Sequence, residues 1–582
     1  MPWANSETRN STSTSVRVAL LLAVLCCLQI ATAQNQLGPQ GSVSESQQYE
    51  KAAAYYENLL AGRSAATMPR AAQIEARTRL ATAYFMLHRF GDSLRALEPL
   101  TTSSHRGGKT SVDIALPAQA WIVRGLNYLE LNQPARAIPS LRWALVTNPN
   151  SGTARLALGD ALARTGRLED ARREYEKQTR LTPQVPDAWY KLGLVRSQLA
   201  SELSRTLSEK SPDSALGQQL AAEEMLAKGN NLQAARTLSR LVHQAPGHLQ
   251  IHADLGRALL EIGNLKQAES EFQQEISLDP ECPLGRFGLA AIATLRGNWD
   301  DAVSALEGLM RTHARELERL LEYPPPGVLR QAWTERKLAI PERLNASQAA
   351  MVWKKWLDDY TSAAPFVKTT AKSNEKCGEL ETQKLAVAGF WVPEPCYRSI
   401  AERLRPKKSQ TKQEQTKLAE AEFRLGNYEA ARGTASKLLD SSPRSEWGAY
   451  WLSKSYAALA EESFVKVGAL NPNSARVHQM LAQHYASWSD YSRAKAEYLA
   501  AIRLAPELPD LHFGLGTVYW RTGEWPNAEE ELRKTLELSP GAAQARYELG
   551  NAYLQQRRWQ EALNELRQVP EDSSAQKLRA TA

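Results

Sequence analysis

The sequence predicts an all-α solenoid, in which short helix hairpins stack one on the next in two blocks. The first observation is a 34-residue period that runs from Ala475 to Gln576, because a fixed period in this range signals a stacked repeat array. The second is helical spacing inside each period, as where Leu511, Leu515 and Val518 recur three or four residues apart. The third is a regular stop, such as Pro540, which cannot donate a backbone hydrogen bond and ends its helix.

Several residue types return at the step of 34 through this stretch. The recurring places hold Ala482, Gly516 and Gly550; Tyr485, Tyr519 and Tyr553; Ala494, Ala528 and Ala562; Tyr498, Leu532 and Leu566; and Pro472, Pro506 and Pro540. The pattern resembles the tetratricopeptide repeat (TPR), whose signature places in the unit starting at Pro509 fall on Leu515, Gly516, Tyr519, Ala528, Leu532 and Pro540. The resemblance implies a right-handed α-solenoid of TPR helix hairpins, in which the first helix of each unit lines a concave groove.

The N-terminus, Met1–Ala33, has the features of a secretory signal peptide. Arg17 precedes an apolar run, Val18–Ile30, and small residues flank a cleavage site after Ala33. The apolar run falls short of the roughly 20 residues that a membrane span needs. We therefore predict a mature chain that is exported, periplasmic or secreted, of a bacterial type, and without a membrane span.

Residues 34–117 predict an N-terminal capping segment before the regular repeats. Ser46–Ala61 has the spacing of one amphipathic helix, and Ile74–Gly107 has that of a degenerate repeat. Gly108–Pro117 follows as a linker. A terminal helix of this kind would cap the open end of the array.

Two blocks of repeats follow, at 118–316 and 412–576. Each contains one unit of only 29 residues, at 186–214 and 446–474, and the first of these lacks the turn between its two helices. We expect these two helices to be fused or kinked. Residues 152–316 align with block 2 at an offset of 260, short unit included, which indicates either a duplicated five-unit block or a coincidence of phase.

Residues 317–411 break this rhythm and predict an irregular, partly helical insert that joins the blocks. Ser347–Tyr360 has the spacing of a helix with Trp353 and Trp356 on one side. The insert is either ordered against the solenoid or built from degenerate helix pairs. After block 2, residues 577–582 form a polar tail.

The charge pattern argues against a nucleic-acid interface, and the cysteines leave open whether the chain forms a disulfide. The net charge is +7, with both signs interspersed, which is unlike the clustered Lys and Arg of a nucleic-acid interface. The mature chain keeps Cys282, Cys377 and Cys396. Cys377 and Cys396 could close a loop by a disulfide worth about 3 kcal/mol, and the alternative is that all three are small core residues.

No catalytic constellation, cofactor motif or metal site emerges from the sequence. His243, His248 and His252 are close together, but they lack an acidic or Cys companion at ligand spacing. We therefore predict a non-enzymatic protein with no cofactor and no metal.

The TPR resemblance also implies which residues face the groove, at the second, fifth, ninth, twelfth and thirteenth places of each unit. In the C-terminal block the partner-binding groove would comprise Trp447, Tyr450, Arg476, Gln479, Gln483, Phe513, Trp520, Arg521, Tyr547 and Asn551. The corresponding N-terminal places are more apolar, and we expect the insert to fill that face; they include Ile122, Leu126, Leu156, Tyr190, Leu194, Leu216, Phe287 and Leu295.

These groove residues predict a scaffold or adaptor that binds an extended peptide or a partner helix. Aromatic side chains supply buried area, and Arg, Gln and Asn bond backbone amides or carboxylates. A clamp for a C-terminal carboxylate is not expected, because Tyr547 stands where TPR clamps carry a polar residue. The alternative is a scaffold subunit for assembling or exporting a polysaccharide in the bacterial envelope, although sugar sites favour Trp and Tyr flanked by carboxylates.

Overall fold

The computed structural model describes most of the chain between residues 45 and 569. The described ranges are 45–61, 68–101, 116–227, 229–247, 250–321, 325–335, 338–344, 347–359, 391–487 and 491–569. Predictions made for Met1–Ala33, Cys377, His248 and residues 577–582 lie outside them. Within these ranges every regular element is helical and none is a strand, so the fold class is the predicted all-α solenoid.

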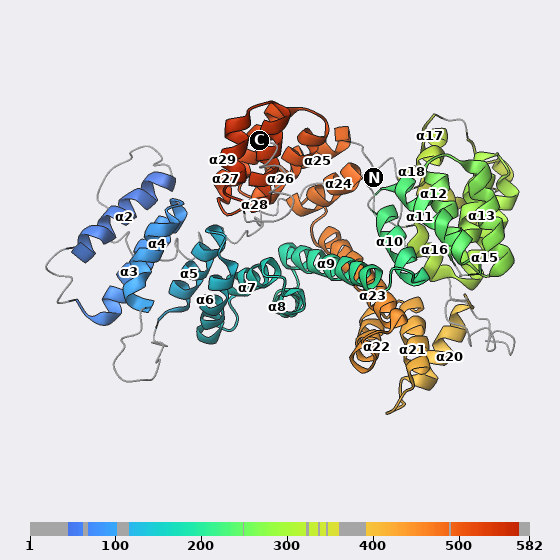
Figure 1. Cartoon of the computed structure of the whole chain (residues 1–582), viewed down its shortest axis with the longest axis horizontal. Helices are drawn as coiled ribbons and strands as arrows, with labels where there is room; N and C mark the ends of the chain where they lie inside the picture. Colours follow the sequence, from blue (N-terminus) through green and yellow to red (C-terminus); the bar gives the residue numbers. More distant parts are fainter. Residues whose placement is uncertain are drawn as a thin grey trace, which may run out of the picture. The chain divides into compact units, whose positions relative to one another are not determined.

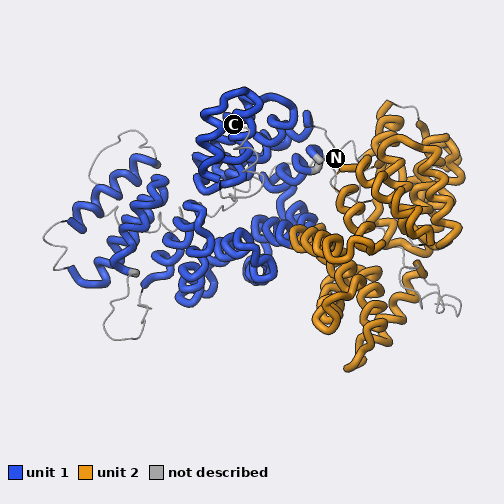
Figure 2. Tube along the Cα trace, in the orientation of Figure 1, with its two compact units in different colours: residues 1–195, 462–582 blue, residues 196–461 orange. Residues whose placement is uncertain are grey.

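Two compact units make up the chain (Figure 2). One consists of two separate segments of the sequence, and the other is a single segment in which the insert interrupts the repeats. Unit 1 comprises residues 1–195 and 462–582, and unit 2 comprises residues 196–461. The units therefore do not coincide with the two blocks recognised in the sequence. Each is described by itself below.

The first part of unit 1 is a run of hairpins between residues 45 and 181 (Figure 1). Its helices are α2 (Glu45–Ala61), α3 (Arg70–Met86), α4 (Phe90–Thr101), α5 (Ala118–Glu130), α6 (Pro134–Thr147), α7 (Gly152–Arg164) and α8 (Leu168–Leu181). Each helix packs on the next along the chain. The second part of unit 1 comprises α24 (Ala475–Ser487), α25 (Tyr491–Leu504), α26 (Pro509–Arg521), α27 (Trp525–Leu538), α28 (Ala543–Gln555) and α29 (Trp559–Leu566).

Unit 2 holds the remaining hairpins and the insert. Its hairpin helices are α10 (Ala215–Ala227), α11 (Asn231–Gln244), α12 (Ile251–Glu261), α13 (Leu265–Leu278), α14 (Pro283–Leu295), α15 (Trp299–Thr312), α21 (Lys412–Arg424) and α22 (Tyr428–Ser441). The insert contributes α16 (Ala314–Leu321), α17 (Gly327–Thr334), the short η3 (Glu342–Leu344), α18 (Gln348–Asp359) and α20 (Glu394–Leu404).

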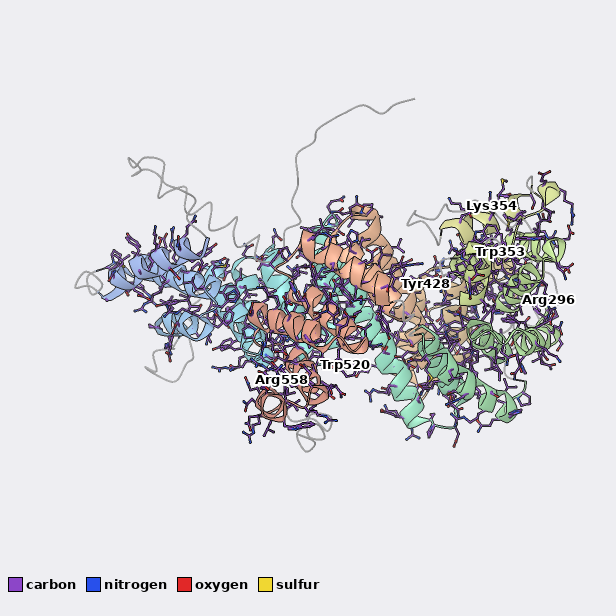
Figure 3. The ribbon with its side chains drawn as sticks, turned by 90° about the horizontal axis from the view of Figure 1, so that it is seen from above. Arg296, Trp353, Lys354, Tyr428, Trp520 and Arg558 are labelled. Atoms are coloured by element: carbon purple, nitrogen blue, oxygen red, sulfur yellow. The ribbon has the colours of Figure 1, made fainter. Side chains whose placement is uncertain are left out.

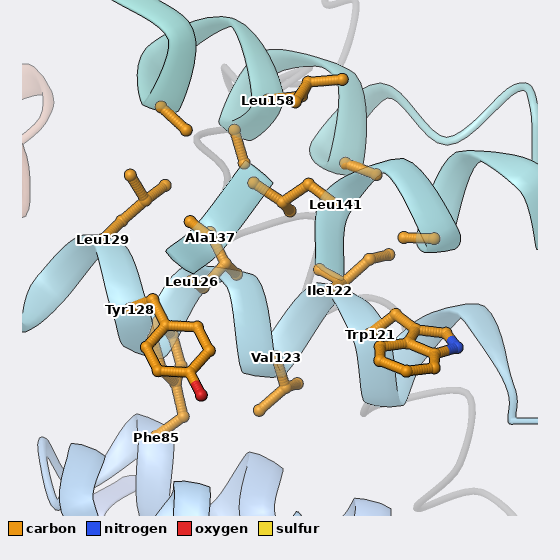
Figure 4. Packing of buried hydrophobic residues seen from close by; sticks show 14 of the residues in the cluster. Phe85, Trp121, Ile122, Val123, Leu126, Tyr128, Leu129, Ala137, Leu141 and Leu158 are labelled. Carbon is orange, nitrogen blue, oxygen red and sulfur yellow. The ribbon is translucent and has the colours of Figure 1, made fainter. Parts of the chain in front are cut away.

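The hairpins close on small residues and turn on glycine. A Cβ on Gly256 of α12 would lie 2.8 Å from the ring of Phe272 on α13, so only glycine admits this contact. Gly263 ends α12 with a φ of +83°, a left-handed conformation that side chains disfavour. Buried apolar side chains then fill the space between successive hairpins, as Trp121, Leu141 and their neighbours do in unit 1 (Figure 4).

The two short units become single long helices, α9 (Pro186–Lys210) and α23 (Glu446–Leu470), each of 25 residues. Of the two alternatives expected for residues 186–214, fused or kinked helices, the structure shows fused helices, and residues 446–474 behave in the same way. The boundary between the compact units crosses both helices: α9 starts in unit 1 and ends in unit 2, and α23 does the reverse.

Each compact unit contains half of one short repeat and half of the other, and the two halves pack together. In unit 2, Arg196 donates to the carbonyl of Leu459 at 3.1 Å and Ser453 donates to the carbonyl of Ala200 at 2.9 Å. In unit 1, the ring of Phe464 packs against Gly193, where a Cβ would clash at 2.5 Å. The short repeats therefore exchange their second halves.

The exchanged contacts repeat at the offset of 260 found in the sequence. In unit 1, Gln483 donates to the hydroxyl of Tyr190 at 3.4 Å. In unit 2, the hydroxyl of Tyr450 lies 3.5 Å from Glu223. Both members of the second pair lie 260 positions from those of the first, which favours a duplicated block over a coincidence of phase.

A polar staple recurs across the hairpins. A His or Arg at the fourth place of a unit bonds a Glu 19 residues later, at distances of 2.7 to 3.0 Å; the pairs are Arg155–Glu174, His252–Glu271, His478–Glu497, His512–Glu531 and Arg546–Glu565. In four of them the same side chain also contacts the carbonyl of the proline six residues earlier. The staple therefore ties both helices of a hairpin to the preceding unit.

Candidate partner-binding surface

The predicted groove residues divide between the two units. Eight of them, Arg476, Gln479, Gln483, Phe513, Trp520, Arg521, Tyr547 and Asn551, belong to unit 1, while Trp447 and Tyr450 belong to unit 2. The two sets are therefore treated as two surfaces.

Arg476 lies at the centre of a buried polar cluster in unit 1. Its guanidinium bonds Asp187 at 2.9 Å and also pairs with Asp510, and it lies 4.6 Å from the ring centroid of Tyr190. Gln479 accepts from Arg476 at 2.7 Å and donates to Asp510 at 3.0 Å. Arg476 and Gln479 are 8% and 2% exposed, so these contacts hold unit 1 together rather than leaving the two side chains open to a partner.

A second ion pair extends this cluster towards α7. Lys191 bonds both oxygens of Asp160, at 2.8 and 2.9 Å, and Tyr175 donates to the same carboxylate at 2.6 Å. Burial lowers the pKa of Lys191, but the charges of Asp160 and Asp187 and the hydrogen bond to Asp160 together raise it by more, and the net pKa lies above its usual value. Burial likewise raises the pKa of Asp510, but the charge of Arg476 and the hydrogen bonds from Gln479 and Arg476 together lower it by more, so the net pKa is lowered.

Sequence reasoning missed the acidic members of this cluster. Asp160, Asp187 and Asp510 occupy the ninth, second and second places of their units, so the rule that selected Arg476 would also have selected them. The rule was applied to both blocks, yet these three carboxylates were not selected. The exchange of half-repeats brings Asp187 of the other block beside Arg476.

The rest of the unit 1 set lies on α26 and α28 and remains accessible. Phe513, Trp520 and Tyr547 are half-buried and Arg521 is exposed. Trp520 packs edge-on against Trp525, with 6.0 Å between ring centroids, and its indole N–H makes no hydrogen bond within the described ranges (Figure 3). These side chains, with Asn551 on α28, form the candidate partner-binding surface.

In unit 2 the insert packs against Phe287, one of the apolar first-helix places that it was expected to fill. Trp353 and Trp356 of α18 pack edge-on against Phe287, at 5.2 and 5.3 Å between centroids. The indole of Trp353 donates to the hydroxyl of Thr294, at the twelfth place of the same helix, at 3.1 Å (Figure 3). The insert is thus ordered against the solenoid over its described helices, and Tyr450 is buried in the same unit.

The described part of the chain carries neither a cluster of metal ligands nor a membrane-spanning helix. No group of three or more His, Cys, Asp or Glu there is placed to hold a metal ion. His252, a member of the candidate triplet, contacts Glu271 and the carbonyl of Pro246. None of the helices in these ranges is long and apolar enough to span a bilayer.

The cysteines differ in state. Cys282 is a buried free thiol, and burial raises its pKa well above its usual value. Cys396 is disulfide-bonded and buried at the start of α20. Its expected partner, Cys377, lies outside the described ranges, and that pairing stays a prediction.

Comparison with protein-family models identifies the repeat. Two tetratricopeptide repeat models match the chain, the first at residues 122–188, 253–311, 480–543 and 513–576, and the second at residues 225–274. The chain is a tetratricopeptide repeat protein. No curated protein matches this TPR chain.

Solved structures share the repeat at low identity. MamA is 24% identical, covering 28% of this TPR chain and 95% of its own, with a TM-score of 0.19. TTC0263, a TPR protein of Thermus thermophilus, is 24% identical over 29% of this chain and 98% of its own, with a TM-score of 0.20. Yeast Tom70 is 13% identical over 88% of this chain and 96% of its own, with a TM-score of 0.21. No argument about arrangement or partners rests on these similarities.

Proposed function

We propose that this protein is a non-enzymatic scaffold that binds a protein partner through the candidate partner-binding surface of unit 1. The observation that carries the proposal is the accessibility of Phe513, Trp520, Arg521, Tyr547 and Asn551, all at first-helix places of α26 and α28. The other groove places of unit 1, around Arg476, are occupied by the chain's own side chains.

The chemistry of this surface suits an extended peptide or a partner helix. Trp, Tyr and Arg dominate the binding energy of protein interfaces because they bury large areas and also make directed polar contacts. A partner backbone laid across α26 and α28 would meet aromatic faces and then Asn551.

The test compares partner capture by the purified wild-type chain and by the double variant Trp520→Ala/Tyr547→Ala. The matched control is Trp559→Ala, because Trp559 is 47% exposed at the start of α29, a second helix of the same unit. Loss of two aromatic contacts should weaken binding by about 2 to 4 kcal/mol, and the control should leave it unchanged. Photocrosslinking from position 513 should reach the same partner.

Equal recovery by wild type and the double variant would reject this surface. Retention on a polysaccharide column that the double variant loses would favour the alternative, an envelope scaffold for polysaccharide assembly or export. A photocrosslinker at position 559 that captures the partner as efficiently as one at 513 would place binding on the second helices.

We also propose that the chain is exported to the periplasm or secreted. The proposal rests on the basic and apolar pattern of Met1–Ala33 and its small-residue cleavage site. N-terminal sequencing of the mature protein should begin at Gln34. Recovery from the cytoplasm with Met1 intact would reject it.

A further inference from the structure

Trp391 and the two residues after it lie deep inside unit 2, although they belong to the insert. Trp391 is 5% exposed and Val392 is fully buried. The backbone N–H of Trp391 donates to Asp279 at 3.0 Å, and that of Val392 donates to the hydroxyl of Tyr397 at 3.3 Å. The segment 391–393 is therefore held by both main chain and side chain.

The indole of Trp391 fits into a site built by two separate parts of unit 2. On one side it packs with Ala253 and Cys282, and the ring of His313 meets it edge-on at 5.8 Å. On the other side the guanidinium of Arg424 stacks over it, 3.4 Å from the ring centroid. This indole connects the repeats that precede the insert with the first repeat that follows it.

The site uses positions that line the concave face of a TPR array. Ala253 is at the fifth place of its unit and Arg424 at the thirteenth place of its own. Leu284, at the second place of the next unit, also packs against this cluster. Trp391 thus occupies, from within the chain, a place where an array of this kind can receive another chain.

The internal occupant leaves hydrogen-bonding capacity unused. Within the described ranges, three buried N–H groups around the stack have no acceptor: Nε1 of Trp391, Nε of Arg424 and Nε1 of Trp451. Arg424 lies between the two indoles, 5.5 Å from the ring centroid of Trp451. Each unmet buried donor weakens the internal contact, so a second occupant in trans can compete with it.

We propose that the segment 391–393 is a built-in occupant of unit 2, and that the same site accepts in trans a peptide with Trp followed by an aliphatic residue and proline. A cation stacked on an aromatic ring favours Trp over other aromatic residues, and Val392 and Pro393 are buried beside it. This surface is separate from the one on α26 and α28, so either proposal can fail without the other.

The experiment uses the full chain and a labelled, end-blocked peptide, Trp-Val-Pro-Glu-Pro, in a fluorescence polarisation titration. Trp391→Ala vacates the place of the indole, and we expect the peptide to bind this variant at least tenfold more tightly than wild type. The comparison peptide, Ala-Val-Pro-Glu-Pro, should bind neither. Adding Arg424→Ala to the Trp391→Ala variant should weaken the peptide at least threefold, because the stacking cation is lost.

Equal affinity of the Trp-containing peptide for wild type and Trp391→Ala would overturn the proposal. So would a folded Trp391→Ala variant that binds the Trp and Ala peptides alike. If Trp391→Ala loses helix content by circular dichroism, Trp391→Phe replaces it. That variant keeps a ring in the site, and a gain of about threefold over wild type is expected; no gain would overturn the proposal as well.

Discussion

Arg476 offers the sharpest test of whether a predicted groove residue serves the fold or a partner. Its side chain is 10% exposed and pairs with two carboxylates, Asp187 and Asp510. Removing one member of a buried ion pair costs about 3 to 5 kcal/mol, because the charges left behind are unpaired. Here the carboxylates are 21% and 42% exposed, and water would recover part of that loss. We expect Arg476→Ala to destabilise unit 1 by about 2 to 3 kcal/mol.

Thermal unfolding followed by circular dichroism measures this loss. At about 2 to 4 °C per kcal/mol, the first transition should fall by about 5 °C or more. The matched control is Arg521→Ala, an exposed arginine on α26, which should change stability by less than about 0.5 kcal/mol. Combining Arg476→Ala with Asp510→Asn should recover part of the loss, because one unpaired charge is then absent.

The pH dependence follows from the lowered pKa of Asp510. A carboxyl group whose folded pKa is lowered contributes stability above its unfolded pKa of about 3.9. That contribution disappears as the pH falls through the lower, folded pKa. The difference between wild type and Arg476→Ala should therefore be full at pH 7 and shrink below about pH 4. A variant that unfolds within 1 °C of wild type, yet loses its partner, would refute the reasoning and return Arg476 to the binding surface.

Three further predictions concern the staples, the contact of Gly541 with Glu130 and the exchanged helices. Both ring nitrogens of His512 contact acceptors, and its pKa is raised. The stabilisation from His512 is therefore present below about pH 6.5 and is lost as the pH rises through the folded pKa. The variant His512→Arg, which places an arginine there as at Arg546, should remove that loss in urea titrations at pH 5.5 and 8. Gly541→Ala should destabilise unit 1 by about 1 to 3 kcal/mol, since its Cβ would lie 2.5 Å from the carbonyl oxygen of Glu130. Hydrogen exchange should then rise at residues 130–132, and unchanged exchange there would contradict the contact. Protein cleaved at a protease site engineered between residues 360 and 376 should elute as one species without denaturant, because each unit contains helices from both fragments; separate elution would contradict the exchange.

The sequence was sufficient for the repeats because their signals are local. Leu515, Gly516 and Leu532 fix one hairpin within a single period, and Gly516 meets Leu532 directly, with 3.0 Å from its ideal Cβ position. Helix ends were equally local, since a glycine in the left-handed region or a proline marks them. The staple at His512 and Glu531 also lies inside one unit, although its pairing was not predicted.

The partner-binding surface could not be predicted from the sequence alone, because the position of a residue within a repeat does not show which residues from other parts of the chain pack against it. Arg476 and Trp520 hold comparable groove places, yet Arg476 is enclosed by Asp187 from a distant part of the chain while Trp520 is half-buried. That neighbour is brought in by the long helix α9, which no property of residues 475–576 reveals.

The sequence by itself determined that this chain is a stack of helix hairpins, and where most of them begin and end, because backbone hydrogen bonds and helix faces are set by neighbours a few residues apart. Only the tertiary structure decided which hairpins share a core. The missing turns in the two short repeats make α9 and α23 continuous, and a continuous helix carries its second half into the other unit. That exchange, together with the Trp391 segment lying inside unit 2, determines which surfaces are left for a partner.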